Sequence, residues 1–370
     1  MRVLIGIPCL LIGGTEIQTL NLVKALTANA HQVTTLCYYE YLPKMVLDYE
    51  QAGSQVVCLS SGSVRVSGKA QVPFLYKGLK NALKKHQPDI IHIQYMAPGA
   101  IPIFLLRILG FSRIIATLHT SANAYKSTQL VRFIQQYAVK AFTCITQEAE
   151  KSFFGSSQLY TENTALNKRN HFTIHNALPD YISIKKTKKK RGESVFIGVV
   201  SRLETIKGMD MVIPAFAELL CLYSHIRLLV VGSGTLLPQM KAEAEARGIT
   251  SKVSFEGQQS QENLSAFYDR IDILLMPSRS EGFGLTAIEG MARGCVVVAS
   301  DTGGLPEVVK DGEVGLLHKS ESVQDMTAKI SALIDTPERW QKLSDNAREY
   351  VKKYSFSYFS YLFNNLYRKL

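Results

Sequence analysis

Short apolar runs alternate with helix-length segments along the first half of the chain. The first run, Arg2–Ile7, precedes Gly13-Gly14 and a segment whose apolar residues, from Ile17 to Leu26, recur at helical spacing. Because two parallel strands need a crossover connection, this alternation predicts a parallel sheet covered by helices on both faces. The other strands predicted in this half are Gln32–Tyr38, Gln55–Leu59, Asp89–Ile93, Arg113–Leu118, Ala141–Ile145 and Phe172–Ile174.

The second half repeats the pattern. The tail from Pro337 to Leu370 is predicted to be helical, with a stripe of Tyr and Phe that packs in a core. A chain of 370 residues is too long for a single hydrophobic core and suits two domains of ordinary size. The strands predicted in this half are Phe196–Val200, Leu228–Val231, Val253–Gly257 and Ile271–Met276.

A glycine loop follows the last of these strands. Pro277 ends the strand, Gly282 and Gly284 favour a tight turn, and a helix is predicted from there to Gly294. The first turn of that helix has unpaired N–H groups, at Gly284 and Leu285, and carries the positive end of the helix dipole. A phosphate group is the ligand that such a helix end favours.

Two carboxylates flank this predicted phosphate site, Glu281 on the loop and Glu289 on the helix. A carboxylate cannot bind a phosphate, whereas it accepts hydrogen bonds from hydroxyls. We therefore expect Glu281 to hold sugar hydroxyls and Glu289 to hold ribose hydroxyls. A nucleoside diphosphate sugar carries both kinds of hydroxyl and the phosphates between them.

A second motif runs from Ser201 to Asp210, directly after a predicted strand. Arg202 at the strand end and Lys207 at a helix start are placed to reach a diphosphate at the edge of the sheet. Each charged hydrogen bond of this kind contributes about 1.5–3 kcal/mol. This pair can neutralise a leaving nucleoside diphosphate without a metal ion, and no Asp-x-Asp metal motif occurs in the sequence. We therefore expect no cofactor.

The stretch around Glu281 and Glu289 resembles the Glu-x7-Glu signature of retaining glycosyltransferases with the GT-B fold, in particular glycosyltransferase family 4. The segments from Asp301 to Val309 and from Asp311 to Leu317 resemble that family as well. The resemblance is strong in the second half of the chain and looser in the first. It implies two Rossmann-like domains whose parallel sheets face a deep cleft, with residues 1–178 binding the acceptor and residues 179–354 the donor. It also implies that a helix of about 355–370 packs back on the first domain.

The resemblance also implies roles for individual residues. Glu281, His119, Arg202 and Lys207 would act in catalysis, with His119 close to the transferred sugar. Retention of the anomeric centre is likewise carried over from the family. His175 and Ala177 depart from the Pro-Asn-Gly that the family has between its domains. The residues implied in donor binding are Gly14, Arg202, Lys207, Gly232, Gly282, Phe283, Gly284, Leu285 and Glu289.

Two of these assignments have simpler alternatives. Gly13 and Gly14 can form an ordinary turn between strand and helix, because no GxGxxG pattern is present. His119 follows a strand and so lies at the edge where doubly wound sheets bind ligands, but a histidine there can also be held by the backbone. His92 also ends a strand and is the next candidate.

The net charge of +11 is concentrated in the first half. Residues 1–180 contain 17 Lys and Arg against 9 Asp and Glu, so we expect a basic first domain that attracts anionic partners. Nucleic acid is not expected as a partner, since no binding motif for it occurs. Phe74–His86 and Ile101–Leu109 are the two helices that could touch an anionic membrane surface, although ordinary surface and core helices have the same pattern.

The cysteines and the hydropathy bear on location. Six cysteines stand singly in apolar segments, without a CxxC pair, as in reduced cytosolic proteins. No apolar run is long enough to span a bilayer. We therefore expect a cytoplasmic protein that can make peripheral contact with the inner face of a membrane.

The function expected from the sequence is transfer of a hexosyl group from a nucleoside diphosphate sugar, with UDP as the first choice, to a saccharide or lipid-linked acceptor of the cell envelope. A nucleotide-sugar epimerase or a glycan phosphorylase of the same fold would instead convert the donor alone or consume phosphate. A non-catalytic nucleotide-sugar-binding protein would bind UDP without transfer, and it would not need to keep all four of Glu281, Glu289, Arg202 and Lys207.

Overall fold

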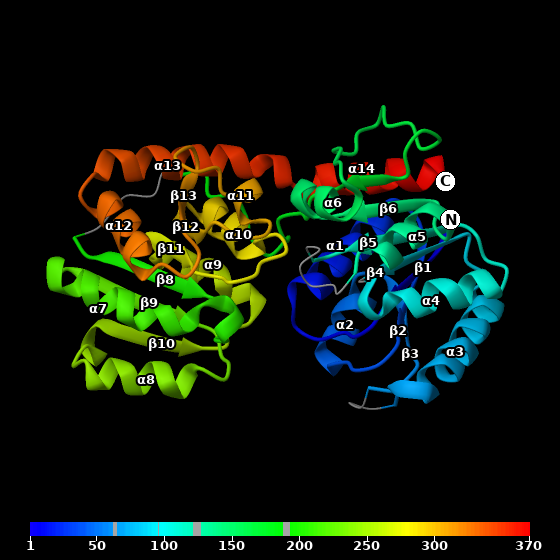
Figure 1. Ribbon diagram of the computed structural model, residues 1–370, viewed down its shortest axis with the longest axis horizontal. Helices are drawn as coiled ribbons and strands as arrows, with labels where there is room; N and C mark the ends of the chain where they lie inside the picture. Colours follow the sequence, from blue (N-terminus) through cyan, green and yellow to red (C-terminus); the bar gives the residue numbers. More distant parts are fainter. Residues whose placement is uncertain (62–64, 95, 121–126, 188–192) are drawn as a thin grey trace. The chain divides into compact units, whose positions relative to one another are not determined.

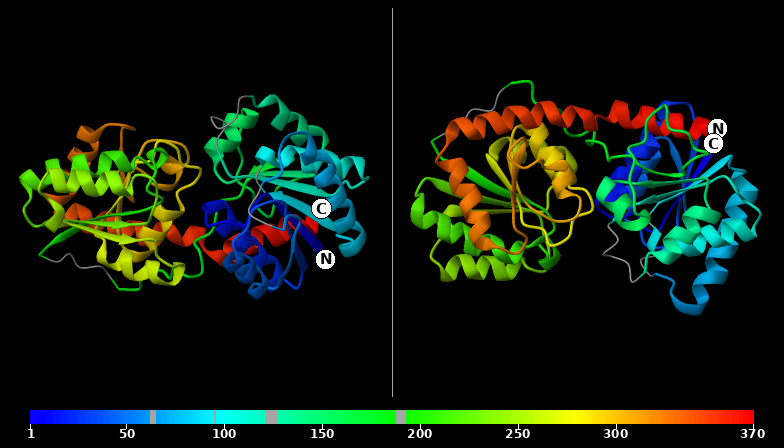
Figure 2. Two further views of the ribbon diagram at one scale, coloured as in Figure 1. Left: turned by 90° about the horizontal axis from the view of Figure 1, so that it is seen from below. Right: turned by 45° about the horizontal axis from the view of Figure 1, so that its top comes forward.

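A computed structural model describes residues 1–61, 65–94, 96–120, 127–187 and 193–370 (Figures 1 and 2). The chain forms two compact units. The first consists of Met1–Pro179 together with Ser355–Leu370, and the second of Asp180–Tyr354. Each unit contains one sheet in which every neighbouring pair of strands is parallel, so the predicted α/β class is confirmed.

The first unit has a seven-stranded sheet of order β3-β2-β1-β4-β5-β6-β7. The order reverses between β1 and β4, which are hydrogen-bonded neighbours. Loops that leave the carboxyl ends of these two strands diverge, and ligands of doubly wound folds bind at such a point. The strands are β1 (Arg2–Ile7), β2 (Gln32–Cys37), β3 (Ser54–Cys58), β4 (Ile90–Gln94), β5 (Ile114–Leu118), β6 (Ala141–Cys144) and β7 (His171–Thr173).

Helices cover both faces of this sheet. Buried residues of α3, α4, α5 and α6 share one apolar cluster with the sheet, so these four helices form a layer on one face. The last helix, α14, packs against α1, and Asn29 donates to the Ser360 hydroxyl there at 3.1 Å. The helices are α1 (Gly14–Ala28), α2 (Pro43–Gln51), α3 (Gln71–His86), α4 (Met96–Ile108), α5 (Gln129–Tyr137), α6 (Gln147–Phe154) and α14 (Phe356–Lys369).

The second unit has a six-stranded sheet of order β10-β9-β8-β11-β12-β13, which reverses between β8 and β11. Asp272 is buried just before β11 and accepts from the backbone N–H of Phe196 at 2.9 Å, and Trp340 donates to the Asp272 carbonyl at 3.2 Å. β12 and β13 were not among the predicted strands. The strands are β8 (Val195–Val200), β9 (Ile226–Val231), β10 (Val253–Gly257), β11 (Ile273–Met276), β12 (Val296–Ser300) and β13 (Gly315–His318).

The helices of the second unit include a long pair at its C-terminal end, α12 and α13. The predicted helical tail is in fact α13, a short 3-10 segment over Val351–Tyr354, and then α14 of the first unit. Of the predicted tail aromatics, Tyr354, Phe359 and Phe363 are buried, whereas Tyr358 and Tyr361 are exposed. The helices are α7 (Val212–Leu222), α8 (Leu237–Ala246), α9 (Gln261–Arg270), α10 (Leu285–Arg293), α11 (Leu305–Val308), α12 (Val323–Ile334) and α13 (Pro337–Tyr350).

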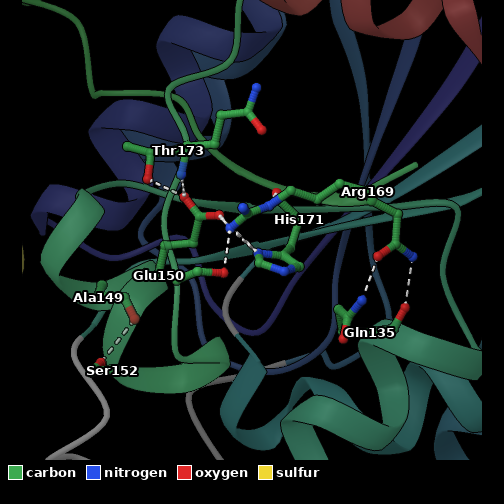
Figure 3. A network of polar contacts seen from close by, with 10 residues as sticks. Gln135, Ala149, Glu150, Ser152, Arg169, His171 and Thr173 are labelled. Atoms are coloured by element: carbon green, nitrogen blue, oxygen red, sulfur yellow. Dashed lines mark hydrogen bonds and ion pairs between the residues drawn. The ribbon is translucent and has the colours of Figure 1, made fainter. Parts of the chain in front are cut away.

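A buried carboxylate organises the end of the first sheet (Figure 3). Glu150 of α6 is fully buried, and one of its oxygens lies 2.8 Å from both Arg169 Nη2 and His171 Nδ1. The other oxygen accepts from the Thr173 hydroxyl at 2.7 Å and from the Gln158 backbone at 3.0 Å. Because every lone pair faces a donor, this charge is compensated, and it ties the segment before β7 to the helix.

Replacing Glu150 with Ala should therefore destabilise the protein strongly. Removing one partner of a buried ion pair leaves the other uncompensated and costs about 3–5 kcal/mol. We expect a lower urea midpoint for the unfolding of the first unit. Glu349→Ala is the matched control, since Glu349 pairs with Lys352 on the surface. Equal midpoints for the two variants would show that the cluster does not stabilise the fold.

Candidate functional site

Two loops meet at the switch point of the second sheet, one after β8 and the other after β11. Gly208 follows the short 3-10 segment Thr205–Lys207 with a φ of 69°, and a Cβ there would lie 1.9 Å from the carbonyl oxygen of Pro277. The backbone N–H of Arg279 donates to the Ile206 carbonyl at 3.0 Å. The two loops are therefore in direct backbone contact, and only glycine fits at the point of closest approach.

This contact brings together two predicted site residues that are far apart in the sequence. Lys207 Nζ lies 2.7 Å from Glu281 Oε2, and each side chain is 18% exposed. From the sequence, Lys207 was expected at the diphosphate and Glu281 at the sugar, but their pairing was not predicted. Both side chains thus lie at one place, mostly shielded from water, where a ligand can contact the ammonium and the carboxylate together.

Arg202 stands just after β8 with an exposed side chain. Its neighbour Glu204 points instead to Thr235, accepting from the backbone at 3.0 Å and from the hydroxyl at 2.6 Å. Those hydrogen bonds lower the pKa of Glu204. Arg202 is therefore available to an anionic ligand at the carboxyl edge of the sheet.

A second arginine, missed by the sequence analysis, holds the two loops together. Arg279 binds Asp210 through both terminal nitrogens, at 2.7 and 2.8 Å, and binds Glu321 through Nε at 2.9 Å. The hydrogen bonds from Arg279 lower the pKa of Asp210. Since a bidentate pair fixes both position and orientation, we assign Arg279 to supporting the site. Both residues stand inside the two motifs, but sequence spacing alone does not show that they pair.

The glycine loop ends at α10, whose N-cap is Gly284 with a φ of 101°. The left-handed conformation is at Gly284, and Gly282 is not among the described glycines with positive φ. The side chain of Phe283 is buried edge-on against Tyr354, with ring centroids 5.5 Å apart. Phe283 therefore packs in the core, and any contact it makes with a donor has to come from its backbone. Leu285 opens the helix, so its N–H has no partner within the helix.

Glu289 of α10 is buried, with 5% of its surface exposed. Its two oxygens accept from Tyr181 at 2.9 Å and from Tyr268 at 2.6 Å. Burial raises the pKa of Glu289, and the two hydrogen bonds oppose that rise. Neither tyrosine was predicted. A carboxylate has about four acceptor sites, so it can still accept from ribose hydroxyls.

Gly232, predicted to contact the donor, has a packing role in the structure. Its φ is 134°, and a Cβ would lie 1.8 Å from the Ser201 carbonyl oxygen. The Leu203 N–H donates to the Ser233 carbonyl at 2.9 Å beside it. The turn after β9 therefore packs closely against the loop that carries Arg202 and supports it.

The carboxyl edge of the first sheet carries the remaining predicted residues. His119 follows β5, and its Nε2 lies 2.8 Å from Oε1 of Gln94, at the end of β4. Because an amide oxygen only accepts, Nε2 carries the proton and Nδ1 is an acceptor. Nδ1 is buried and has no partner among the described residues, and burial lowers the pKa of His119 to about 4. His119 is thus a neutral acceptor that a hydroxyl could satisfy.

Two further candidates of the first unit, His92 and the Gly13-Gly14 turn, are also described by the structure. His92 is fully buried and bonded on both sides, to Tyr367 at 2.7 Å and to Thr117 at 2.6 Å, so it is a structural residue. Burial lowers its pKa to about 3. Gly13 has an extended φ of −163° and caps α1, which begins at Gly14. This turn needs no left-handed residue, and the donor contact assigned to Gly14 stays a prediction.

The chain is similar to known proteins over most of its length. The family described as "Glycosyl transferases group 1" matches residues 180–350, and the one described as "Glycosyl transferase 4-like" matches residues 9–149. An uncharacterised glycosyltransferase of Methanocaldococcus jannaschii is 28% identical over 93% of this chain and 91% of its own. A D-inositol 3-phosphate glycosyltransferase of Rhodococcus erythropolis is 35% identical over 44% of this chain and 39% of its own.

Solved structures agree on the fold. The crystal structure of Anabaena HepE in complex with UDP superposes with a TM-score of 0.80 at 17% identity, covering 100% of both chains. Two parallel sheets with flanking helices are the GT-B architecture. The chain belongs to the family-4 type of glycosyltransferases, and it is an enzyme that transfers glycosyl groups.

The contact between the two loops can be tested with Gly208→Ala. Alanine would have to adopt a left-handed φ and would also clash with the Pro277 carbonyl. The site should therefore be distorted and the second unit destabilised. Gly248→Ala is the control, because Gly248 has a similar φ of 67° but no atom within 4 Å of the added Cβ. We expect Gly248→Ala to cost about 1 kcal/mol in urea unfolding and Gly208→Ala clearly more. Equal losses would mean that the loops do not need this close approach.

Proposed function

We propose that the enzyme is a retaining, metal-independent hexosyltransferase that uses a UDP-sugar and a saccharide or lipid-linked acceptor. One observation supports the donor assignment above all. Lys207, Arg202 and the N-terminal end of α10 all lie around the carboxyl ends of β8 and β11, at the switch point of the second sheet. Two cations and a helix end are the features that a diphosphate requires.

The chemistry follows from how charge moves in the reaction. As the bond to the sugar breaks, negative charge grows on the departing diphosphate, and preorganised cations stabilise that state more than the ground state. Lys207 is positioned by Glu281 and would contact the phosphate from there. Glu281 would accept from sugar hydroxyls, and Glu289 from the ribose. We identify no protein nucleophile, so the proposal is attack on the same face, with a donor phosphate oxygen accepting the acceptor proton.

UDP is the proposed nucleotide because structures of Anabaena HepE were obtained with UDP, with UDP and glucose, and with UDP-glucose. His119 is proposed to accept a hydrogen bond from a sugar hydroxyl, since its Nδ1 has no partner among the described residues. It acts as a neutral base rather than a cation, because burial lowers its pKa to about 4.

The proposed place of action is the cytoplasm, at the inner face of the membrane, in the synthesis of a cell-envelope polysaccharide or glycolipid. Six free cysteines support a reducing compartment. In the described part of the chain no helix is long and apolar enough to cross a bilayer.

The whole proposal is tested by a donor screen. Purified protein is incubated with UDP- and GDP-sugars, and free UDP and GDP are measured with and without EDTA. We expect slow release of UDP that EDTA does not affect. Products that form only when inorganic phosphate is added would instead identify a phosphorylase. Conversion of the sugar without release of nucleotide would identify an epimerase.

Lys207→Ala should lower turnover. Losing one charged hydrogen bond to the leaving diphosphate costs about 1.5–3 kcal/mol, or about 10- to 150-fold in kcat. The measurement is the rate of UDP release at saturating donor. Lys342→Ala is the control, because Lys342 is an exposed lysine of α13. A kcat equal to that of the parent would remove Lys207 from the reaction.

Glu289→Ala should weaken donor binding, because the ribose hydroxyls lose their acceptor. We expect the Kd for UDP, measured by calorimetry, to rise about tenfold or more. The exposed Glu218 of α7 provides the control Glu218→Ala. Glu289→Gln keeps the shape of the side chain, so it separates loss of the charge from loss of packing against Tyr181 and Tyr268. Unchanged UDP affinity in both Glu289 variants would contradict the assignment.

A further inference from the structure

The layer of helices α3, α4 and α5 has an outer surface unlike the rest of the protein. Neighbouring helices of this layer are in contact, and their buried sides share one core with the first sheet. Their outer sides therefore form one continuous face of the first unit, and Figures 1 and 2 show these helices side by side, in blue to green. The side chains on this face come from the sequence between β3 and the end of β6.

That sequence is almost free of acidic residues. Residues 51–147 contain eleven Lys and Arg but one acidic residue, Asp89, so this stretch has a net charge of +10 out of +11 for the whole chain. Asp89 itself pairs with Arg2 at 3.5 Å. The lysines of α3 are exposed, and none forms an ion pair with another described residue. They are Lys77, Lys80, Lys84 and Lys85.

Large apolar side chains stand beside this charge. On α5, Leu130 is 49% exposed, Phe133 50% and Tyr137 61%, and their spacing puts them on one side of the helix. The rings of Phe133 and Tyr137 are 5.1 Å apart, and Phe104 of α4 lies 6.3 Å from Phe133. Ile108, at the end of α4, is 72% exposed. We call Ile108, Leu130, Phe133 and Tyr137 the apolar ridge.

The ridge is separate from the side of α5 that packs on the sheet. Val131, Ile134 and Ala138 are buried, so the helix is apolar on two sides, one packed in the core and the other about half exposed. From the sequence, Phe74–His86 and Ile101–Leu109 were the two candidate membrane helices. The second is mostly core, with Ile103, Leu105 and Leu106 buried, and α5 was not considered.

We propose that this face docks on an anionic lipid bilayer, with the apolar ridge at the boundary of headgroups and acyl chains and the α3 lysines over the headgroups. Apolar and aromatic side chains beside a cluster of Lys and Arg are the composition of interfacial membrane helices, and the two attractions add. The proposal rests on the proposed function only in that a lipid-linked acceptor would be presented in the same surface.

A nucleic acid fits this face less well than a bilayer does. Phosphate backbones need cations, and bases stack on aromatic rings, but the aliphatic side chains of Ile108 and Leu130 have no counterpart in such an interface. A bilayer accommodates both kinds of side chain. Because the attachment combines a shallow apolar contact with surface charge, it is peripheral and reversible.

Flotation with vesicles tests the proposal. The full-length protein is mixed with vesicles of phosphatidylcholine, with or without about one third phosphatidylglycerol, at low and at high salt. Binding is expected to the anionic vesicles only, and it should fall as salt rises. In Leu130→Ser/Phe133→Ser/Tyr137→Ser, and separately in Lys80→Glu/Lys84→Glu, we expect the apparent Kd to rise about tenfold or more.

Two control variants carry one substitution of each kind elsewhere. Leu222→Ser alters a residue of α7 that is 71% exposed, and Lys342→Glu reverses a charge on α13. Both should bind vesicles like the parent. If ridge and control variants bind alike, or if the parent ignores anionic vesicles at low salt, the proposal is wrong. Tighter binding to single-stranded RNA than to vesicles, unaffected by the ridge variant, would also overturn it.

The same samples separate this inference from the proposed function. Release of UDP from a soluble donor does not need a membrane, so the ridge and lysine variants should retain it, which also shows that they are folded. Retained UDP release without vesicle binding sinks only the membrane inference. Vesicle binding without UDP release from any donor sinks the proposed function and leaves the membrane inference standing.

Discussion

The close approach of two loop backbones is the constraint on which the candidate site of the second unit depends. Gly208 touches the Pro277 carbonyl, and Gly303 stands in the same relation to the carbonyl of Glu281, where a Cβ would be 2.1 Å from the oxygen. Glycines at both contacts let the loop that carries Glu281 lie between two others without space for side chains. The positions of Lys207 and Glu281 relative to each other follow from this backbone packing, so their 2.7 Å contact is a result of the fold.

The site shows two ways of handling a carboxylate. Glu281 is partly exposed and paired with a cation, whereas Glu289 is buried and receives two phenol hydroxyls. In the first case an opposite charge compensates the carboxylate, and in the second neutral donors do so. Neutral donors compete less strongly with substrate hydroxyls than a cation would, because a cation adds the attraction of a full opposite charge to its hydrogen bond. Glu289 is therefore suited to accept from a ligand's hydroxyls. Glu281 can do so freely only when Lys207 pairs with another anion.

The sequence predicted more of the fold than of the candidate site. All strands except β12 and β13 were predicted, because a buried parallel strand is a continuous apolar run. The motif residues at strand ends fall at the sheet edge by topology. Pairings between residues distant in sequence were not predictable. Lys207 and Glu281, or Glu289 and Tyr268, meet only after the sheet has ordered its strands. Gln94 carried no signal, since a glutamine ending a strand is common, and its importance comes from His119 beside it.

The two units differ in continuity along the chain. The second is a single stretch, Asp180–Tyr354, whereas the first is completed only by Ser355–Leu370. On the ribosome, domains usually fold in the order in which they emerge. Here the sheet that emerges first must wait for α14, including the Tyr367 that reaches His92, until the second unit has been synthesised in full. The unit begun first is thus finished last, and its incomplete form is the species that chaperones would meet during translation.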